Sequence, residues 1–354
     1  MKPVNHQNAN PMLSVIIPCY DIGSYLGQCL DSVLKQKAIK QTEIICINDG
    51  SADDTGQVLE SYKNKYSDNI KVLSHKNNYG VSLARNYGLS EARGKYVMFL
   101  DGDDWIGYKF AEDERIIDSW YLNKFITGIT CYDNVAVSIG NLIRHDTDMD
   151  PKINNMLIYE SNVMNDTNKI LDFLDRRVSS CAALYNNEII KGEKLSFKKD
   201  LLYFEDAHFI TSYILHSCDK YPNAALLHDA FYMYRNRKGS AMYNLCASHE
   251  GTMRRLERTR NRIFHYSNLV IKCTDKRQKG HFARMLNISA RRLSRNLYFI
   301  NRYQDLAPTS ASLYGPLKKY VPKDCIGCQK HDCTNCINLK KLISLAKSTQ
   351  KVLG

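Results

Sequence analysis

The first hundred residues alternate between short, mainly apolar runs and segments with helical periodicity. A short apolar run bounded by polar or turn residues predicts a strand buried on both faces. Such runs occupy residues 13–18, 43–47, 70–73 and 96–100. Helices are predicted between them, at residues 24–36, from an Asp53 or Asp54 cap to about Tyr62, and at residues 80–92. This order favours an α/β fold, with a mostly parallel sheet and helices on both faces.

The pattern becomes less regular after Trp105. Helices are predicted near residues 112–123 and 167–176, with an apolar run at 125–131 and shorter alternating runs at 135–139 and 156–159. From Thr252 onward the pattern is helical and basic. The sequence therefore predicts an α/β domain followed by a basic helical region.

Three carboxylates follow the predicted strand at residues 96–100 within four positions, Asp101-Gly102-Asp103-Asp104. Open α/β sheets bind their ligands at the carboxyl ends of the strands. Acids this close repel one another, and a cation or a donor-rich ligand among them relieves that repulsion. A solvated Asp-Gly turn is the alternative interpretation.

Two neighbouring strand ends carry related chemistry, in Pro18-Cys19-Tyr20-Asp21 and in Asn48-Asp49-Gly50-Ser51. A tyrosine face can stack on a planar base, and a carboxylate can accept a base N–H. A further carboxylate can hold a divalent metal on a diphosphate. The glycine-rich fingerprints of dinucleotide-binding and P-loop proteins are absent, which argues against those classes.

Four motifs together resemble family 2 glycosyltransferases. They are residues 15–20, 48–51 with Asp54-Thr55, 80–88 and 101–104, and a weaker resemblance continues through 204–206 and 234–240. The resemblance implies a Rossmann-like GT-A fold, a nucleotide-diphospho-sugar donor and a Mn²⁺ or Mg²⁺ ion. Asp21 departs from the pattern, because the family usually has asparagine there.

The resemblance also implies roles for individual residues on the donor side. Asp101 faces the ribose or diphosphate and, with Asp103, binds the metal. Arg85 contacts the diphosphate or braces the acidic turn, and a structural salt bridge to Asp101 or Asp104 is its alternative. The base pocket is implied at Pro18, Tyr20 and Asp49.

On the acceptor side, Glu205 and Asp206 resemble the family's catalytic acidic pair, with Asp206 as general base. A carboxylate within hydrogen-bond reach can take the proton of a sugar hydroxyl as it attacks. Acids favoured at a helix N-terminus are the alternative, and the two interpretations are compatible. Arg235 and Arg237 resemble a loop that closes over the diphosphate, although arginines in polar loops are often only solvated.

The expected organisation has three parts. A polar segment at residues 1–11 precedes a GT-A domain at 12–245, with a nucleotide-binding half at 12–110 and an acceptor half at 111–245. A basic helical region follows at 250–354. Residues 1–11 do not resemble a signal peptide, and no apolar run is long enough to span a bilayer. We therefore expect a cytoplasmic protein.

Charge is distributed unevenly along the chain. Residues 251–354 contain 22 Lys and Arg against 5 Asp and Glu, whereas the preceding 250 residues contain 27 against 32. Such a tail suggests an anionic membrane surface or nucleic acid as partner, or a solvated helical surface.

An arginine stripe, defined as Arg284, Arg291, Arg295 and Arg302, lies opposite Phe282, Leu286, Leu293, Leu297 and Ile300 on a helical wheel.

We expect the apolar side of this helix to pack on the body of the protein. The arginine stripe is then free for anionic lipid or a lipid-linked acceptor, so a peripheral position at the inner face of the membrane is expected rather than a nucleic-acid partner.

A cysteine cluster lies within this region, at residues 325–336. Two Cys-x-x-Cys pairs, separated by only four residues, have the character of zinc ligands. Reduced thiols and a disulfide pair are the alternatives to a structural Zn²⁺ site. The cluster consists of Cys325, Cys328, Cys333 and Cys336.

The combined prediction is a metal-dependent, inverting, hexosyltransferase-like enzyme. It transfers a sugar from a nucleotide-diphospho-sugar to a glycan or lipid-linked acceptor in surface polysaccharide or glycolipid biosynthesis. One alternative is a sugar-nucleotide nucleotidyltransferase, which usually carries a glycine-rich basic first loop unlike residues 18–21. The other is an adaptor with an inactive core that binds membrane or nucleic acid through its basic tail.

Overall fold

The computed structural model divides the chain into two compact units, Met1–Lys199 with Glu205–Arg237, and Asp200–Phe204 with Lys238–Gly354. It describes residues 10–110, 115–146, 162–177, 179–199, 201, 204–237, 258–259, 261–263, 265–270, 278–286 and 288–289. The expected domain boundary at residues 245–250 lies outside these ranges, as does the N-terminal segment up to residue 9.

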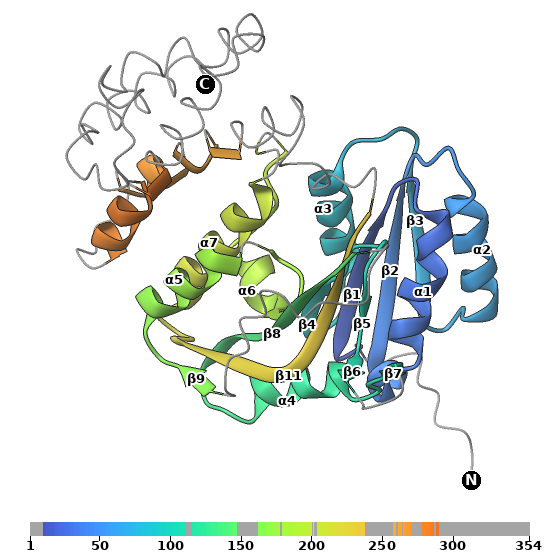
Figure 1. The fold of residues 1–354 in the computed structure, drawn as a ribbon, viewed down its shortest axis with the longest axis horizontal. Coiled ribbons are helices and arrows are strands. Elements are labelled where there is room, and N and C mark those ends of the chain that lie inside the picture. The colour runs from blue at the N-terminus through green and yellow to red at the C-terminus, as the bar shows by residue number, and fades with distance from the viewer. Residues whose placement is uncertain are drawn as a thin grey trace, which may run out of the picture. The chain divides into compact units, whose positions relative to one another are not determined.

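The amino-terminal half of the first unit is a parallel sheet with strand order β3-β2-β1-β4. Its strands are β1 (Leu13–Cys19), β2 (Thr42–Asp49), β3 (Ile70–His75) and β4 (Tyr96–Phe99), joined by α1 (Gly23–Leu34), the 3₁₀ helix η2 (Lys37–Gln41), α2 (Thr55–Lys65) and α3 (Val81–Glu91). Right-handed crossovers place α1 and α2 on one face and α3 on the other (Figure 1). The predicted strands and helices of this half are confirmed.

The sheet continues through β4 into a mixed half with order β4-β10-β8-β11-β5. Its strands are β5 (Trp105–Ile106), β8 (Val135–Asp146), β9 (Asn162–Met164), β10 (Ala183–Asn186) and β11 (Asn223–Asn236). β10 is antiparallel to both β4 and β8, while β8 and β11 are parallel. The helices are α4 (Tyr121–Thr130), α5 (Thr167–Arg177), α6 (Asn187–Gly192) and α7 (Glu205–Ser217).

The helix predicted near residues 112–123 is wrong. Arg115–Ile117 is strand β7, which pairs with β6 (Tyr108–Phe110) in a hairpin, and helix α4 begins only at Tyr121. The Asp118 carboxylate accepts the backbone N–H of Trp120 at 3.0 Å and so stabilises a turn between strand and helix. The helix at 167–176 is confirmed as α5, the run at 135–139 begins β8, and the run at 156–159 lies outside the described residues.

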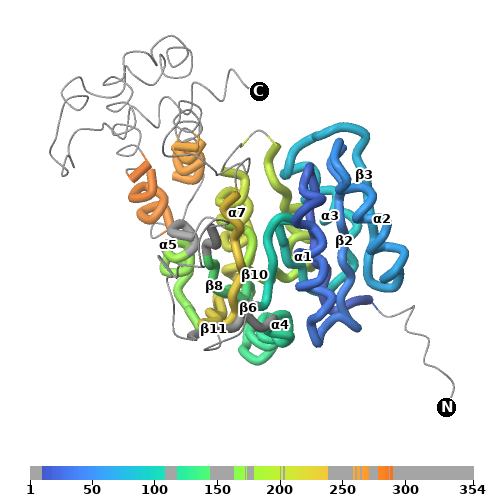
Figure 2. Tube along the Cα trace, turned by 45° about the vertical axis from the view of Figure 1, so that its right-hand side comes forward, coloured from blue at the N-terminus to red at the C-terminus, as the bar shows by residue number. Residues whose placement is uncertain are grey.

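A cluster of aromatic rings fixes α7 against the centre of the sheet. Phe209 of α7 stacks on Phe197 with ring centroids 4.3 Å apart, and it meets Phe99 of β4 edge-on at 5.5 Å. Tyr213, one turn further along α7, donates a hydrogen bond to the backbone oxygen of Ala136 at 2.6 Å. These contacts bring the first turn of α7, with its two acids, to the end of β4. Figure 2 shows α5 beside α7.

The second unit has its own buried contacts among the described residues. Phe204 meets His265 and Tyr266 edge-on, and Tyr266 stacks on Phe282. Leu286 is also buried there, and the packing of this apolar side on the body of the protein stays a prediction. Arg284 is the part of the arginine stripe that the structure describes; its other members and the cysteine cluster lie outside those ranges. In the described part of the chain, no helix has the length and apolar character to cross a bilayer.

Candidate active site

Hydrogen bonds join the turn after β1 to the turn after β2. Asp21 has a left-handed backbone, with φ of 48°, and its carboxylate accepts the N–H of Ala52 at 2.8 Å. Its own N–H donates to the Ser51 hydroxyl at 3.2 Å. Aspartate and asparagine both tolerate this conformation and both offer a side-chain oxygen. The departure at Asp21 therefore preserves the local backbone that asparagine would form.

Asp49 is buried and shapes the loop that leads into α3. Its carboxylate accepts the backbone N–H groups of Tyr79 at 3.0 Å and Gly80 at 2.8 Å, and it lies 2.6 Å from Nδ1 of His75. Tyr20 is 45% exposed and Tyr79 is 52% exposed, so both have ring surface available to a ligand. The base-binding roles of Pro18, Tyr20 and Asp49 stay predictions.

The acidic turn after β4 contains one buried carboxylate and two carboxylates that are partly exposed. Asp104 is buried, where it accepts hydrogen bonds from the Tyr232 hydroxyl at 2.6 Å and from the Arg235 N–H at 2.7 Å. Burial, together with the charges of Asp103 and Asp101, raises the pKa of the Asp104 carboxyl. Asp104 therefore anchors β11 to the turn, and Asp101 and Asp103 remain partly exposed.

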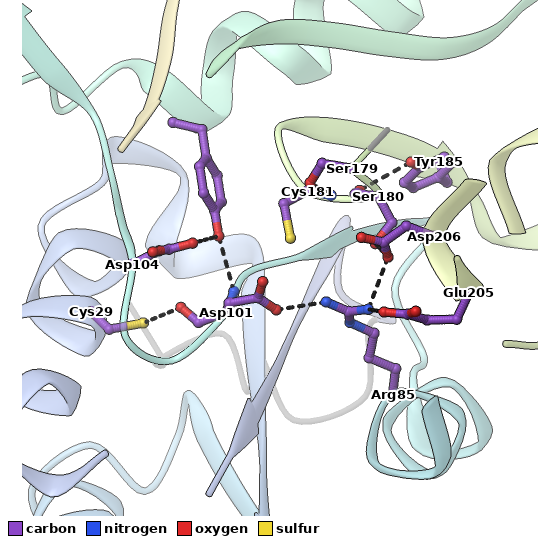
Figure 3. A network of polar contacts seen from close by, with 11 residues as sticks. Cys29, Arg85, Asp101, Asp104, Ser179, Ser180, Cys181, Tyr185, Glu205 and Asp206 are labelled. Carbon is purple, nitrogen blue, oxygen red and sulfur yellow. Dashed lines mark hydrogen bonds and ion pairs between the residues drawn. The ribbon is translucent and has the colours of Figure 1, made fainter. Parts of the chain in front are cut away.

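Arg85 of α3 is buried and joins the acidic turn to the first turn of α7 (Figure 3). Its Nη2 donates to Asp101 Oδ1 at 2.7 Å, and its Nη1 donates to Asp206 Oδ1 at 2.9 Å and lies 3.6 Å from Glu205 Oε1. Burial acts to lower the pKa of this guanidinium, but the charges of Asp206 and Asp101 outweigh it and raise the pKa. The alternative salt bridge to Asp101 is present, and no ion pair joins Arg85 to Asp104.

The acidic pair begins α7, where the helix dipole favours negative charge. The Ser180 hydroxyl donates to Asp206 Oδ1 at 2.6 Å, so the described residues engage only one oxygen of Asp206. Burial, followed by the charge of Asp206, raises the pKa of the Glu205 carboxyl to about 7. The two neighbouring acids therefore occupy different environments.

Arg235 lies in strand β11, so the predicted loop containing both arginines is wrong in part. β11 continues to Asn236 because it pairs with β8 up to Asp146. The Arg235 guanidinium donates to the backbone oxygen of Asp103 at 2.7 Å and to the side chain of Gln28. Arg237, just beyond the strand, donates to Asp103 Oδ2 at 2.8 Å.

Both arginines also lie over the ring of Tyr25, at 5.0 Å for Arg235 and 4.9 Å for Arg237. Arg235 lies over Trp105 as well, at 4.5 Å. Cation–π contacts of this kind hold a guanidinium in place while leaving its charge intact. The two arginines are therefore positioned beside the acidic turn.

Asp101 and Asp103 suit a divalent ion that is bound together with a diphosphate. Burial and the charge of Asp101 raise the pKa of Asp103, although Arg237 acts in the opposite direction, so a nearby cation is favourable. Among the described residues, no group of three or more His, Cys, Asp or Glu side chains could hold a metal alone. Mg²⁺ and Mn²⁺ suit such a site, because carboxylates, water and phosphate oxygens can share their coordination.

Three contributors to this site escaped the sequence analysis: Ser180, Tyr232 and Tyr25. Each lies in a segment whose local pattern indicates only an ordinary helix, strand or loop. Ser180 and Tyr232 touch acids that lie far away in the sequence, and no short motif encodes such a pairing.

The sequence profile of glycosyl transferase family 2 matches residues 14–190, and the chain belongs to this family. It is 28% identical over 231 residues to the uncharacterized glycosyltransferase EpsJ of Bacillus subtilis, covering 65% of this chain and 62% of EpsJ. It is 30% identical over 233 residues to the minor teichoic acid biosynthesis protein GgaA of the same organism, covering 64% of this chain and 48% of GgaA. The chain thus spans less than two thirds of each of these relatives.

Solved structures share the GT-A fold of this chain. S. aureus TarS 1–349 superposes with a TM-score of 0.58 at 17% identity, covering 96% of this chain and 91% of TarS 1–349. The mannosyltransferase PcManGT of Pyrobaculum calidifontis, solved with GDP-Man and Mn²⁺, superposes with a TM-score of 0.54 at 14% identity, covering 97% of this chain and 88% of the other. These likenesses establish the predicted fold class.

Proposed function

We propose that this protein is an inverting glycosyltransferase that moves a sugar from a nucleotide-diphospho-sugar to a hydroxyl of a glycan or lipid-linked acceptor. The observation that carries the proposal is the network around Arg85, which joins the acidic turn to the acids of α7. Family 2 membership and the Mn²⁺ and GDP-Man complex of PcManGT support the choice of donor class. The relation to GgaA supports a role in surface polysaccharide assembly.

Asp206 is the proposed general base. Its Oδ1 is held by Arg85 and Ser180, so Oδ2 can accept the proton of the acceptor hydroxyl. The acceptor oxygen then forms a bond to the anomeric carbon, while the bond from that carbon to the diphosphate oxygen breaks. Attack opposite the leaving group inverts the anomeric centre.

Asp101 and Asp103 are the proposed metal ligands. A bound Mn²⁺ or Mg²⁺ supplies positive charge to the diphosphate as it leaves. Arg235 and Arg237 lie at the same turn and add positive charge to that side of the site. Tyr20 and Asp49 are the proposed contacts of the nucleotide base, and a peripheral position at an anionic membrane is the proposed location.

The test is nucleotide release from UDP-GlcNAc and GDP-Man, with and without Mn²⁺, followed by NMR of the product's anomeric configuration. We expect metal-dependent release of a nucleoside diphosphate and a product of inverted configuration. Release of pyrophosphate from a nucleoside triphosphate and a sugar phosphate would instead indicate a nucleotidyltransferase. Specific ligand binding by the basic tail, with no turnover of any donor, would indicate the adaptor.

A further inference from the structure

A pocket lies away from the acidic turn, between helix α4 and strand β11. Its volume is about 330 Å³, and Leu227 of β11 forms part of its wall. Trp120 and Tyr132 both line it, and these two residues are 54% and 53% exposed. Trp120 immediately precedes α4, and Tyr132 lies just beyond its end. The two rings therefore flank the ends of a ten-residue helix, which is about 15 Å long.

The charged groups at the pocket carry a net negative charge. Lys124 Nζ lies 2.7 Å from Asp118 Oδ2 and 2.6 Å from Asp229 Oδ2, and it donates to the backbone oxygen of Asp229 at 2.9 Å. One positive charge is thus matched by two carboxylates, of which Asp229 is half exposed. Such a surface does not attract an anionic polymer, but the half-exposed Asp229 carboxylate offers acceptors to neutral hydroxyl groups.

Asn123 supplies an unused acceptor at the same pocket. Its Oδ1 is buried and has no hydrogen-bond partner among the described residues. A buried polar atom without a partner is unfavourable, so a ligand donor that reaches it is stabilising. Because the terminal torsion of asparagine is soft, a rotation of the amide can present Oδ1 to a ligand.

We propose that this pocket binds a neutral segment of a glycan chain. Aromatic faces pack against the apolar C–H faces of sugar rings, while the polar groups between them bond to hydroxyls. Single exposed aromatics are ordinary on a protein surface. Here two of them line one pocket with a polar lining, at the two ends of a helix about 15 Å long, and a span of that length suits an oligosaccharide better than a single sugar.

The pocket and the catalytic candidates lie at different parts of β11. Asp229 lies at the pocket, within the irregular stretch of β11 between Leu226 and Phe231, whereas Arg235 lies at the acidic turn. The regular strand from Phe231 to Arg235 alone spans about 13 Å. Figure 1 shows α4 below β11. A glycan bound in the pocket contacts the protein several sugar units away from the hydroxyl group that reacts. This part of the inference rests on the proposed function, because it takes the glycan to be the acceptor.

Binding can be tested without any turnover. The chain has two tryptophans, of which Trp105 is 7% exposed and Trp120 is 54% exposed, so acrylamide quenching reports mainly on Trp120. The probes are maltohexaose, cellohexaose and chitohexaose, with hexagalacturonate as the anionic comparison. We expect at least one neutral hexasaccharide to protect Trp120 from quenching, and hexagalacturonate to protect it less. Absence of protection by all three neutral probes at millimolar concentration overturns the proposal.

Variants locate the binding to the pocket, with affinities measured by calorimetry. Trp120→Ala and Tyr132→Ala should each weaken the affinity for the hexasaccharide about tenfold, and Trp120→Phe should retain most of it. Tyr79→Ala is the matched control, since Tyr79 is 52% exposed but lies at the donor side. Equal weakening by Tyr79→Ala, or no weakening by the two pocket variants, contradicts the proposal.

Activity separates this inference from the proposed function. With an acceptor polysaccharide, Trp120→Ala should raise the KM for the long acceptor severalfold and leave donor hydrolysis without acceptor unchanged. If the wild-type protein releases no nucleotide from any donor, the proposed function fails while the binding result still stands. If nucleotide release is normal but no oligosaccharide binds, the pocket proposal alone fails.

Discussion

Arg85 donates a hydrogen bond to Asp206 at 2.9 Å, although the two residues are 121 positions apart in the sequence. The same guanidinium donates to Asp101 at 2.7 Å. A carboxylate proposed for the donor side and a carboxylate proposed as the base are therefore held by one buried cation. The planar guanidinium offers separate N–H groups to the two acids, which an ammonium group cannot arrange in the same way.

Removal of Arg85 should damage both stability and turnover. Arg85→Met leaves Asp101, Glu205 and Asp206 without their shared cation, and loss of one partner of a buried ion pair destabilises by about 3–5 kcal/mol. Urea unfolding should show this loss at neutral pH. Arg85→Lys, the control that keeps the charge, should be more stable than Arg85→Met but should still have a reduced kcat. Wild-type stability in Arg85→Met would contradict the structural role.

Asp206→Asn should lower kcat by about 10²–10⁴-fold, the range typical for loss of a general base. Donor affinity, measured by calorimetry with a nucleotide-sugar, should barely change. Ser180→Ala should have a smaller effect on kcat, because Ser180 only orients Asp206 through its 2.6 Å hydrogen bond. A collapse of donor affinity in Asp206→Asn would assign Asp206 to the donor site.

Asp103→Ala should abolish Mn²⁺-dependent nucleotide release while leaving the fold intact, because its side chain is partly exposed rather than part of the core. Circular dichroism checks the fold, and a Mn²⁺ titration of activity checks the metal. Arg237→Gln is an informative partner variant, since Arg237 competes with a cation for Asp103 Oδ2. It should bind Mn²⁺ at least as tightly as wild type. Unchanged metal dependence in Asp103→Ala would disprove the ligand assignment.

Glu205 should make stability depend on pH in a defined direction. Its pKa is raised to about 7 in the folded protein, so the folded state binds this proton more tightly than the unfolded state. The contribution of Glu205 to stability is then greatest below its ordinary pKa near 4.5 and is lost as the pH rises through about 7. Glu205→Gln removes the titration. The Tm of Glu205→Gln should rise relative to wild type between pH 5 and pH 8, and a parallel shift at both values would contradict this prediction.

The basic tail should bind anionic vesicles. The arginine stripe and the surplus of Lys and Arg after residue 250 favour contact with anionic lipid, and salt should weaken it. Co-sedimentation at low and high ionic strength measures the binding. Replacement of all four stripe arginines by Gln should release the protein into the supernatant, whereas neutral vesicles should bind neither form. If the wild-type protein does not co-sediment with anionic vesicles at low salt, the predicted membrane interaction is wrong.

The sequence by itself determined the parallel half of the sheet and the chemistry at its edge. Apolar runs specify β1 to β4 locally, and turn residues end each strand, so Tyr20, Asp49 and Asp101 necessarily lie at or just beyond strand ends. The motifs around these residues also resemble family 2 glycosyltransferases, and the match to the family profile confirms that resemblance. Beyond Trp105 the pattern was weaker, and the helix near residues 112–123 was mispredicted because the β6–β7 hairpin depends on pairing between strands.

Only the tertiary structure decided which side chains meet. The packing of Phe209 against Phe197 and Phe99 sets where α7 begins, and so places Asp206 beside Arg85. Long-range strand pairing extends β11 to Asn236 and draws Arg235 into the sheet. The pocket of α4 and β11 likewise joins segments about a hundred residues apart. Periodicity describes one element at a time, whereas these contacts depend on how distant elements pack together.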